Sequence, residues 1–165
     1  DVQSIIKTDS INYALQNVIS NIDGPSTTLR VSVVPIKVYI EADEQNLSQK
    51  VSNNQLEIFL KRNLIEAGCN FVTDKKDADY LLKLKANTKP LGIIWGNMQT
   101  AALSLSISLF DNKNNAEIFK DGLQDVKGFQ TTPENAGFDA YKTVEGIKKK
   151  NIYPGLVNEL LKVEQ

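Results

Sequence analysis

The side chains most often used for catalysis are scarce in this chain of 165 residues. It contains no histidine and a single cysteine, Cys69. Histidine is the side chain whose ordinary pKa suits proton transfer near neutral pH, and it is also the commonest transition-metal ligand. A Ser–His–Asp triad, a Cys–His pair, an internal disulfide and a thiolate metal cluster are therefore impossible within the chain. We interpret Cys69 as a small buried apolar residue.

Two acidic stretches are the remaining candidates for chemistry. Asp77 and Asp79 are close enough for a paired-carboxylate site, but the first falls in an expected turn and the second at a strand entrance. The stretch 111–117 has the oxygen content of a calcium loop, yet it lacks the alternating acids and the central glycine, and Lys113 would repel a cation. Its asparagines favour a simple hairpin turn. We predict no catalytic residues, no metal, no cofactor and no enzymatic activity.

Composition narrows the class of protein further. Nineteen basic and twenty acidic residues nearly cancel, which argues against a nucleic-acid partner. An apolar content of 41% with 24% charged residues is typical of a soluble globular domain, and the length allows a core without cross-links. No run approaches the roughly 20 apolar residues of a membrane-spanning helix. The lysines at 148–150 fit a solvated helix end.

Hydrophobic periodicity and turn residues place the elements along the chain. Ser52 and Gln55 have the spacing of a capping box, and Gly68 supplies a left-handed stop to the helix between them. Thr132 followed by Pro133 is the favoured order at the start of a helix. We expect first a helix at 9–22, then strand residues at 28–41, where Pro35 marks a sheet edge or a break between two short strands. A loop at 42–51 and a helix from Ser52 to Gly68 follow. Strands are expected at 71–72, 78–88, 99–111 and 116–128 (the last with a bulge at Gly122), before a final helix that Pro154 kinks or restarts.

These elements predict an α+β fold. We expect an antiparallel or mixed sheet of four or five strands with two long helices packed on one face, as a single layered sandwich. We expect residues 1–27 to form an N-terminal helix and lead-in, or a linker, and residues 28–165 to form the α+β domain.

The segment from Pro90 to Gly96 is unusual for a connection between strands. It carries Ile93, Ile94 and Trp95 between two glycines, whereas such connections are normally polar. Two interpretations remain open: the segment folds onto the core or extends the strands, or it offers an apolar anchor to a partner. We predict Ile93, Ile94 and Trp95 as the partner-binding residues. A hairpin that inserts into a membrane is a weaker variant of the second interpretation.

The order of elements from Ser52 onward resembles a small α+β domain of bacterial envelope-assembly lipoproteins. The features that carry the resemblance are the helix ending Leu64-Ile65-Glu66-Ala67-Gly68, the strand opening Ala78-Asp79-Tyr80, the long hairpin, and a last helix with Ala136 and Ala140. This group includes the curli secretion factor CsgG, the penicillin-binding-protein activator LpoB and the N-terminal domain of TolB. The membrane-spanning hairpins of CsgG are not evident in this sequence.

The resemblance implies a non-enzymatic domain in the periplasm or at the outer membrane of a bacterium. It would bind another protein or the cell wall during envelope assembly. The chain begins at Asp1 without a signal peptide or a lipid-accepting cysteine, so we interpret it as a mature form or as one domain of a longer protein with a lipid anchor. Three alternatives remain: a regulatory or scaffold module fused to an enzyme, a small-molecule-binding domain with a pocket between sheet and helices, and a hydrolase that uses two carboxylates.

Overall fold

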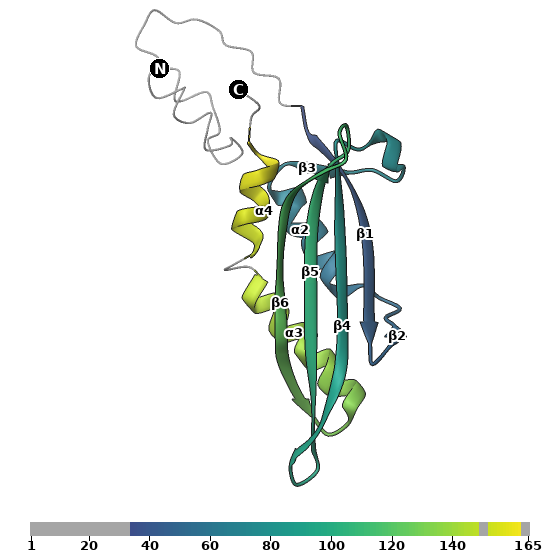
Figure 1. Cartoon of the computed structure of the whole chain (residues 1–165), viewed down its shortest axis with the longest axis vertical. Coiled ribbons are helices and arrows are strands. Elements are labelled where there is room, and N and C mark those ends of the chain that lie inside the picture. Colours follow the sequence, from purple (N-terminus) through teal and green to yellow (C-terminus); the bar gives the residue numbers. More distant parts are fainter. Residues whose placement is uncertain (1–33, 149–151, 163–165) are drawn as a thin grey trace, which may run out of the picture. The chain divides into compact units, whose positions relative to one another are not determined.

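The computed structural model describes residues 34–148 and 152–162 (Figure 1). The helix expected at 9–22 and the first strand residues before 34 lie outside this part of the chain. The elements are β1 (Ile36–Asn46), β2 (Gln49–Lys50), α2 (Gln55–Glu66), β3 (Cys69–Phe71), β4 (Tyr80–Trp95), β5 (Met98–Asp111), β6 (Ala116–Gln130), α3 (Pro133–Lys148) and α4 (Ile152–Leu160).

The described strands form one mixed sheet in the order β2-β1-β4-β5-β6, with β3 paired to the start of β1. β1 runs parallel to β3 and β4, and the chain crosses between β1 and β4 through α2. β4, β5 and β6 form an antiparallel meander. The helices α2 and α3 lie behind the sheet in Figure 1, so among the described residues these helices cover one face of the sheet.

Side-chain alternation divides the central strands between the two faces. Leu82 and Leu84 of β4 pair with Leu109 and Ile107 of β5, and all four are buried beneath the helices. Most of their neighbours on the other face are polar, as in the pair Lys85 and Ser106, whereas Leu81 and Phe110 form an apolar pair there. A period of two is the signature of a half-buried strand, and the sequence alternation in 78–88 and 99–111 correctly identified both strands.

The α+β class and the helices on one face are therefore confirmed, and the details differ. The sheet has six strands because two very short ones, β2 and β3, add to opposite ends of β1. Three helices are present in the described residues, because the chain after α3 resumes as α4 with Pro154 in its first turn. The loop expected at 42–51 is wrong: β1 continues to Asn46 and turns through Leu47 and Ser48 into β2. Both turn residues have positive φ.

The start of α2 does not use the expected capping box. The helix begins at Gln55, and its N-cap residue Asn54 makes no side-chain capping bond. Glu44, which is fully buried on β1, accepts hydrogen bonds from the backbone amides of Leu56 at 3.1 Å and Glu57 at 2.8 Å. A carboxylate at this position pairs the free amides of the first turn and complements the positive end of the helix dipole.

The helix α3 begins where its sequence predicts and packs tightly against the edge strand β6. The hydroxyl of Thr132 accepts a hydrogen bond from the amide of Asn135 at 3.2 Å. Gly128 of β6 lies so close to the backbone of Ala136 and Ala140 that a Cβ at position 128 would collide with it. The two alanines are fully buried, as expected for a helix that approaches the sheet closely.

The bulge predicted in β6 exists, but it lies beyond Gly122. The register shifts where Leu103 and Leu105 meet Val126 and Leu123, and Asp125 takes a positive φ of 54°. The extra residue explains why the apolar parity of the sequence shifts between Phe119 and Val126. A Cβ on Gly122 would meet the carbonyl oxygen of Leu105, so that glycine serves a close backbone approach.

Candidate functional site

The apolar segment predicted as a partner-binding loop is the end of a protruding β-hairpin. β4 runs to Trp95 and β5 begins at Met98, so only Gly96 and Asn97 form the turn. The pairing of β1 with β4 ends at Asn87, and that of β6 with β5 ends at Gln99. From Ile93 to Met98 the ribbon therefore has no neighbouring strand among the described residues. We call residues 91–98 the hairpin tip; it is the lowest part of the ribbon in Figure 1.

Apolar side chains of the hairpin tip face solvent. Ile93 is 63% exposed and Ile94 is 50% exposed, whereas the large apolar side chains in the middle of β4 and β5 are mostly buried. The strand-extension interpretation is thus confirmed for the backbone, and the exposed isoleucines leave the contact interpretation open. Trp95 is the last residue of β4 and lies opposite Met98.

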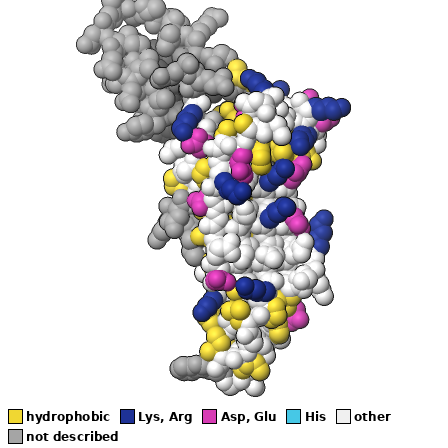
Figure 2. Space-filling model, viewed as in Figure 1, with side chains coloured by type: hydrophobic (Ala, Val, Ile, Leu, Met, Phe, Trp, Pro, Cys, Tyr) yellow, Lys and Arg dark blue, Asp and Glu magenta, His cyan; other side chains and the backbone are white. Residues whose placement is uncertain are grey.

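Sequence reasoning missed three members of this surface. Leu91 and Met98 are about half exposed, and Phe129, which pairs with Thr100 from β6, is 41% exposed. Leu91 belongs to the unusual apolar segment from Pro90 to Gly96. Phe129 could not be found from local sequence, because only the sheet register brings it to the base of the tip. Figure 2 shows apolar side chains gathered at this end of the molecule.

The edges of the hairpin tip are poorly suited to strand pairing. Register shifts occur between Pro90 and Gly92 and again between Ile93 and Trp95. Gly92 takes a φ of +99°, a conformation that other residues rarely adopt. Proline, bulges and twisted edges are the devices by which proteins prevent edge-to-edge association. The tip therefore presents side chains rather than a regular row of main-chain groups.

Charge is absent from the hairpin beyond its base. No Lys, Arg, Asp or Glu occurs between Lys89 and Asp111. At the base, Lys89 lies 3.7 Å from Asp125, and both side chains are largely exposed. Nearby, Thr100 is buried, and its hydroxyl has no hydrogen-bond partner in the described part of the chain. An unpaired buried hydroxyl costs about 1–3 kcal/mol.

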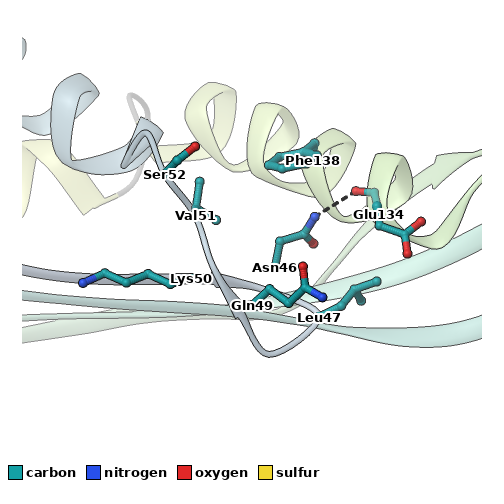
Figure 3. A pocket seen from close by; sticks show the side chains of 8 residues that line it. All are labelled: Asn46, Leu47, Gln49, Lys50, Val51, Ser52, Glu134 and Phe138. Carbon is teal, nitrogen blue, oxygen red and sulfur yellow. Dashed lines mark hydrogen bonds between the residues drawn. The ribbon is translucent and has the colours of Figure 1, made fainter.

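A second candidate is a hollow of about 170 Å³ between the β1–β2 turn and α3 (Figure 3). This volume is below the roughly 300–1,000 Å³ of typical ligand pockets. The one deeply buried polar side chain in its wall is Asn46. Both the nitrogen and the oxygen of its amide already form hydrogen bonds within the protein. The hollow gives no support to the small-molecule alternative. Its lining residues are Asn46, Leu47, Gln49, Lys50, Val51, Ser52, Glu134 and Phe138.

The polar groups behind this hollow form a closed network that joins β1, β4 and α3. The Asn46 amide nitrogen donates to the carbonyl of Glu134 at 2.9 Å, and its oxygen accepts from the Thr88 hydroxyl at 2.6 Å. Thr88 in turn accepts from the amide of Leu47 at 2.9 Å. A Cβ at Gly137 would strike Asn46, so the network depends on a helix without a side chain there.

Tyr141 of α3 extends the same junction. Its hydroxyl donates toward the carbonyl oxygens of Gln45 at 3.0 Å and Ala86 at 3.3 Å. Burial, helped by the negative charge of Glu44, raises the pKa of the Tyr141 phenol well above its usual range. The phenol is therefore a neutral structural donor rather than an acid poised for proton transfer. We call Glu44, Asn46, Thr88, Gly137 and Tyr141 the polar junction.

The acidic residues considered for chemistry have structural roles where the structure assigns them contacts. Asp79 accepts a hydrogen bond from the backbone amide of Lys37 at 2.9 Å, and Asp74 caps the short 3₁₀ turn Lys75–Asp77. Asp77 is exposed in that turn. The β5–β6 connection is the expected asparagine-rich turn, in which Asp111 accepts from the amide of Lys113 at 2.8 Å.

The only cysteine has no sign of reactivity, and the described helices are too short or too polar to span a membrane. Cys69 is buried, as expected, and burial raises the pKa of its thiol, which disfavours the reactive thiolate. No helix in residues 34–148 or 152–162 combines the length and the apolar character needed to cross a membrane.

Comparisons with known proteins gave structural likeness only. No family model and no functionally described protein matches the sequence. The fold is similar to a neuraminyllactose-binding hemagglutinin homolog from Helicobacter pylori, with 14% identity over 83% of this chain and 90% of that chain and a TM-score of 0.47. It is similar to a lipoprotein from Neisseria meningitidis at 14% identity, with coverages of 72% and 99% and a TM-score of 0.46.

The C-terminal domain of LpoB from Salmonella enterica is also similar, at 12% identity over 55% of this chain and 84% of that domain, with a TM-score of 0.37. LpoB is one of the proteins in the resemblance drawn from sequence, whereas likeness to CsgG and TolB stays a prediction. All three TM-scores lie below 0.5.

Proposed function

We propose that this chain is a non-enzymatic docking domain of a bacterial envelope lipoprotein, located in the periplasm or at the outer membrane. It binds another protein or the cell wall through the hairpin tip. The observation that carries the proposal is the exposure of Ile93 and Ile94 on a ribbon that extends past its neighbouring strands. A fold does not need such a ribbon for its own stability, and exposed apolar groups of this kind mark interaction surfaces.

The side chains that could perform catalysis are either absent or engaged in structural contacts, which supports a binding role. The chain has no histidine, and burial disfavours the thiolate of Cys69. Asp79 accepts a backbone hydrogen bond, and Glu44 caps a helix. The described hollow is small and its buried amide is already paired. The protein therefore works through surface complementarity.

The test compares two matched double variants. Ile93→Ser with Ile94→Ser alters the hairpin tip, and Ile58→Ser with Ile65→Ser alters two equally exposed isoleucines on α2. Both proteins are used to capture partners from envelope extract of the bacterium that makes the chain. We expect the tip variant to lose the capture shown by the unaltered chain and the α2 variant to retain it. Equal capture by both variants would refute the assignment of the docking surface.

A further inference from the structure

We infer that the hairpin tip inserts into the interfacial layer of a phospholipid bilayer. The inference rests on the proposed function, because it takes the same tip as the docking surface. It adds lipid as the material that the tip touches beside the protein or wall partner. Four features of the described residues support it: a ribbon without flanking strands, the length of its apolar part, its lack of charge, and the position of its tryptophan.

The first feature is the exposure of apolar side chains on a ribbon that has no flanking strand in the described part of the chain. Beyond Gln99 on β5 and Asn87 on β4 no described strand pairs with it, and Ile93 and Ile94 are both at least half exposed. A protein or cell-wall partner docked against part of the tip leaves the rest of these apolar side chains uncovered. A fluid apolar layer would cover them in whichever direction they point.

The second feature is length. From Leu91 to Trp95 the strand rises about 3.3 Å per residue, which gives about 13 Å of apolar ribbon. Interfacial segments bury their apolar groups about 5–10 Å into the boundary between headgroups and acyl chains. The outer main-chain groups of the ribbon lack strand partners, and hydrocarbon would not satisfy them. The tip therefore stays in the hydrated boundary and does not cross the membrane.

The third and fourth features concern charge and the tryptophan. The hairpin has no charged residue beyond Lys89, and the pair of Lys89 with Asp125 at its base nearly cancels. Figure 2 shows charged side chains above the apolar end and not on it. Trp95, the only tryptophan, stands at the end of β4, and tryptophan favours the membrane–water boundary. Apolar transfer, rather than attraction to anionic lipid, drives the contact.

The experiment mixes the whole chain with vesicles of phosphatidylcholine and, separately, of phosphatidylcholine with phosphatidylglycerol. Vesicle flotation measures binding, and the emission of Trp95 reports the environment of the tip because no other tryptophan contributes. We expect co-flotation with both kinds of vesicle, a blue shift of the emission, and less than about a twofold change between low and high salt. Ile93→Ser with Ile94→Ser should weaken binding by about tenfold or more, while Ile58→Ser with Ile65→Ser binds normally.

Failure of the inference is distinct from failure of the proposed function. No flotation and no emission shift, or equal flotation of both double variants, would overturn lipid insertion. Binding only to the anionic vesicles, abolished by salt, would also overturn it, because attraction of surface lysines would then explain the result. If the tip variant still loses capture from envelope extract in any of these cases, the docking function stands and its partner is not lipid.

Discussion

The hairpin tip and the polar junction distribute polarity in opposite ways. At the tip, Ile93 and Ile94 face solvent while the hydroxyl of Thr100 nearby is buried without a partner. At the junction, Glu44 and Asn46 are buried and their hydrogen bonds are satisfied by α2, α3 and β4. The junction uses buried polar groups to fix the positions of helices, whereas the tip leaves apolar groups for something outside the chain.

This difference predicts where the protein tolerates change. Substitution in or beside the junction should reduce the free energy of unfolding, because buried donors or close backbone contacts would be disturbed. Substitution at the tip should leave folding nearly unchanged and remove docking.

Gly128→Ala should have the largest effect. Its Cβ would collide with the backbone of Ala136 and Ala140, which can yield only if α3 moves away from β6. We expect a loss of about 3 kcal/mol in the free energy of unfolding, measured with urea. The control is Gly146→Ala in α3, where the space around the glycine is open. This substitution should stabilise the folded protein by about 0.5–1 kcal/mol. Equal effects would show that the close approach of β6 to α3 does not limit stability at position 128.

Glu44→Gln should cost about 2 kcal/mol. The amide keeps the shape of the side chain, but it loses the charge that complements the start of α2 and presents one donor where two acceptors are needed. Urea unfolding again measures the change. Glu41→Gln on the exposed side of the same strand should change stability by less than about 0.5 kcal/mol. An unaffected Glu44→Gln protein would mean that α2 holds its start without this carboxylate.

Tyr141→Phe should cost about 1 kcal/mol at neutral pH, because it removes a donor to two buried carbonyls. Burial raises the pKa of this phenol in the folded protein above the ordinary value of about 10. The unfolded chain therefore releases the proton first as pH rises, so the stabilisation is complete below about pH 10 and declines above it. Thermal unfolding at increasing pH should show a shallower alkaline decline for Tyr141→Phe than for the unaltered protein.

Trp95→Ala should have the smallest effect on folding and the clearest effect on docking. Residue 95 ends a ribbon that has no flanking strand among the described residues, so we expect less than about 0.5 kcal/mol change in unfolding free energy and loss of capture from envelope extract. A loss of about 3–5 kcal/mol would instead identify Trp95 as a core residue and remove it from the docking surface.

Local pattern was sufficient for the elements whose residues repeat regularly. The alternation of Tyr80, Leu82, Leu84 and Ala86 marked β4, and Thr132 with Pro133 marked the start of α3. The turn that includes Asn112, Asn114 and Asn115 fell where its residues predicted. In each case neighbouring residues decide the conformation, so the information lies within a few positions of the chain.

Long-range partners explain the errors. Ser52 and Gln55 have a favourable capping spacing, yet Glu44 from another element takes the helix amides, and this moves the helix start to Gln55. The β1–β2 turn was missed because Leu47 and Ser48 are not typical of positive φ. The amide of Leu47 is bonded to Thr88, a residue that the sequence separates from it by 41 positions.

The sequence by itself determined the α+β class, the lack of histidine chemistry and the three consecutive apolar residues Ile93, Ile94 and Trp95. These follow from composition and from short-range periodicity. The tertiary structure alone decided that Ile93 and Ile94 stand in solvent, that Phe129 lies near them, and that Glu44 and Tyr141 are structural. Exposure and hydrogen bonding depend on which strands end first and which helices pack where, and those contacts join residues far apart in the chain.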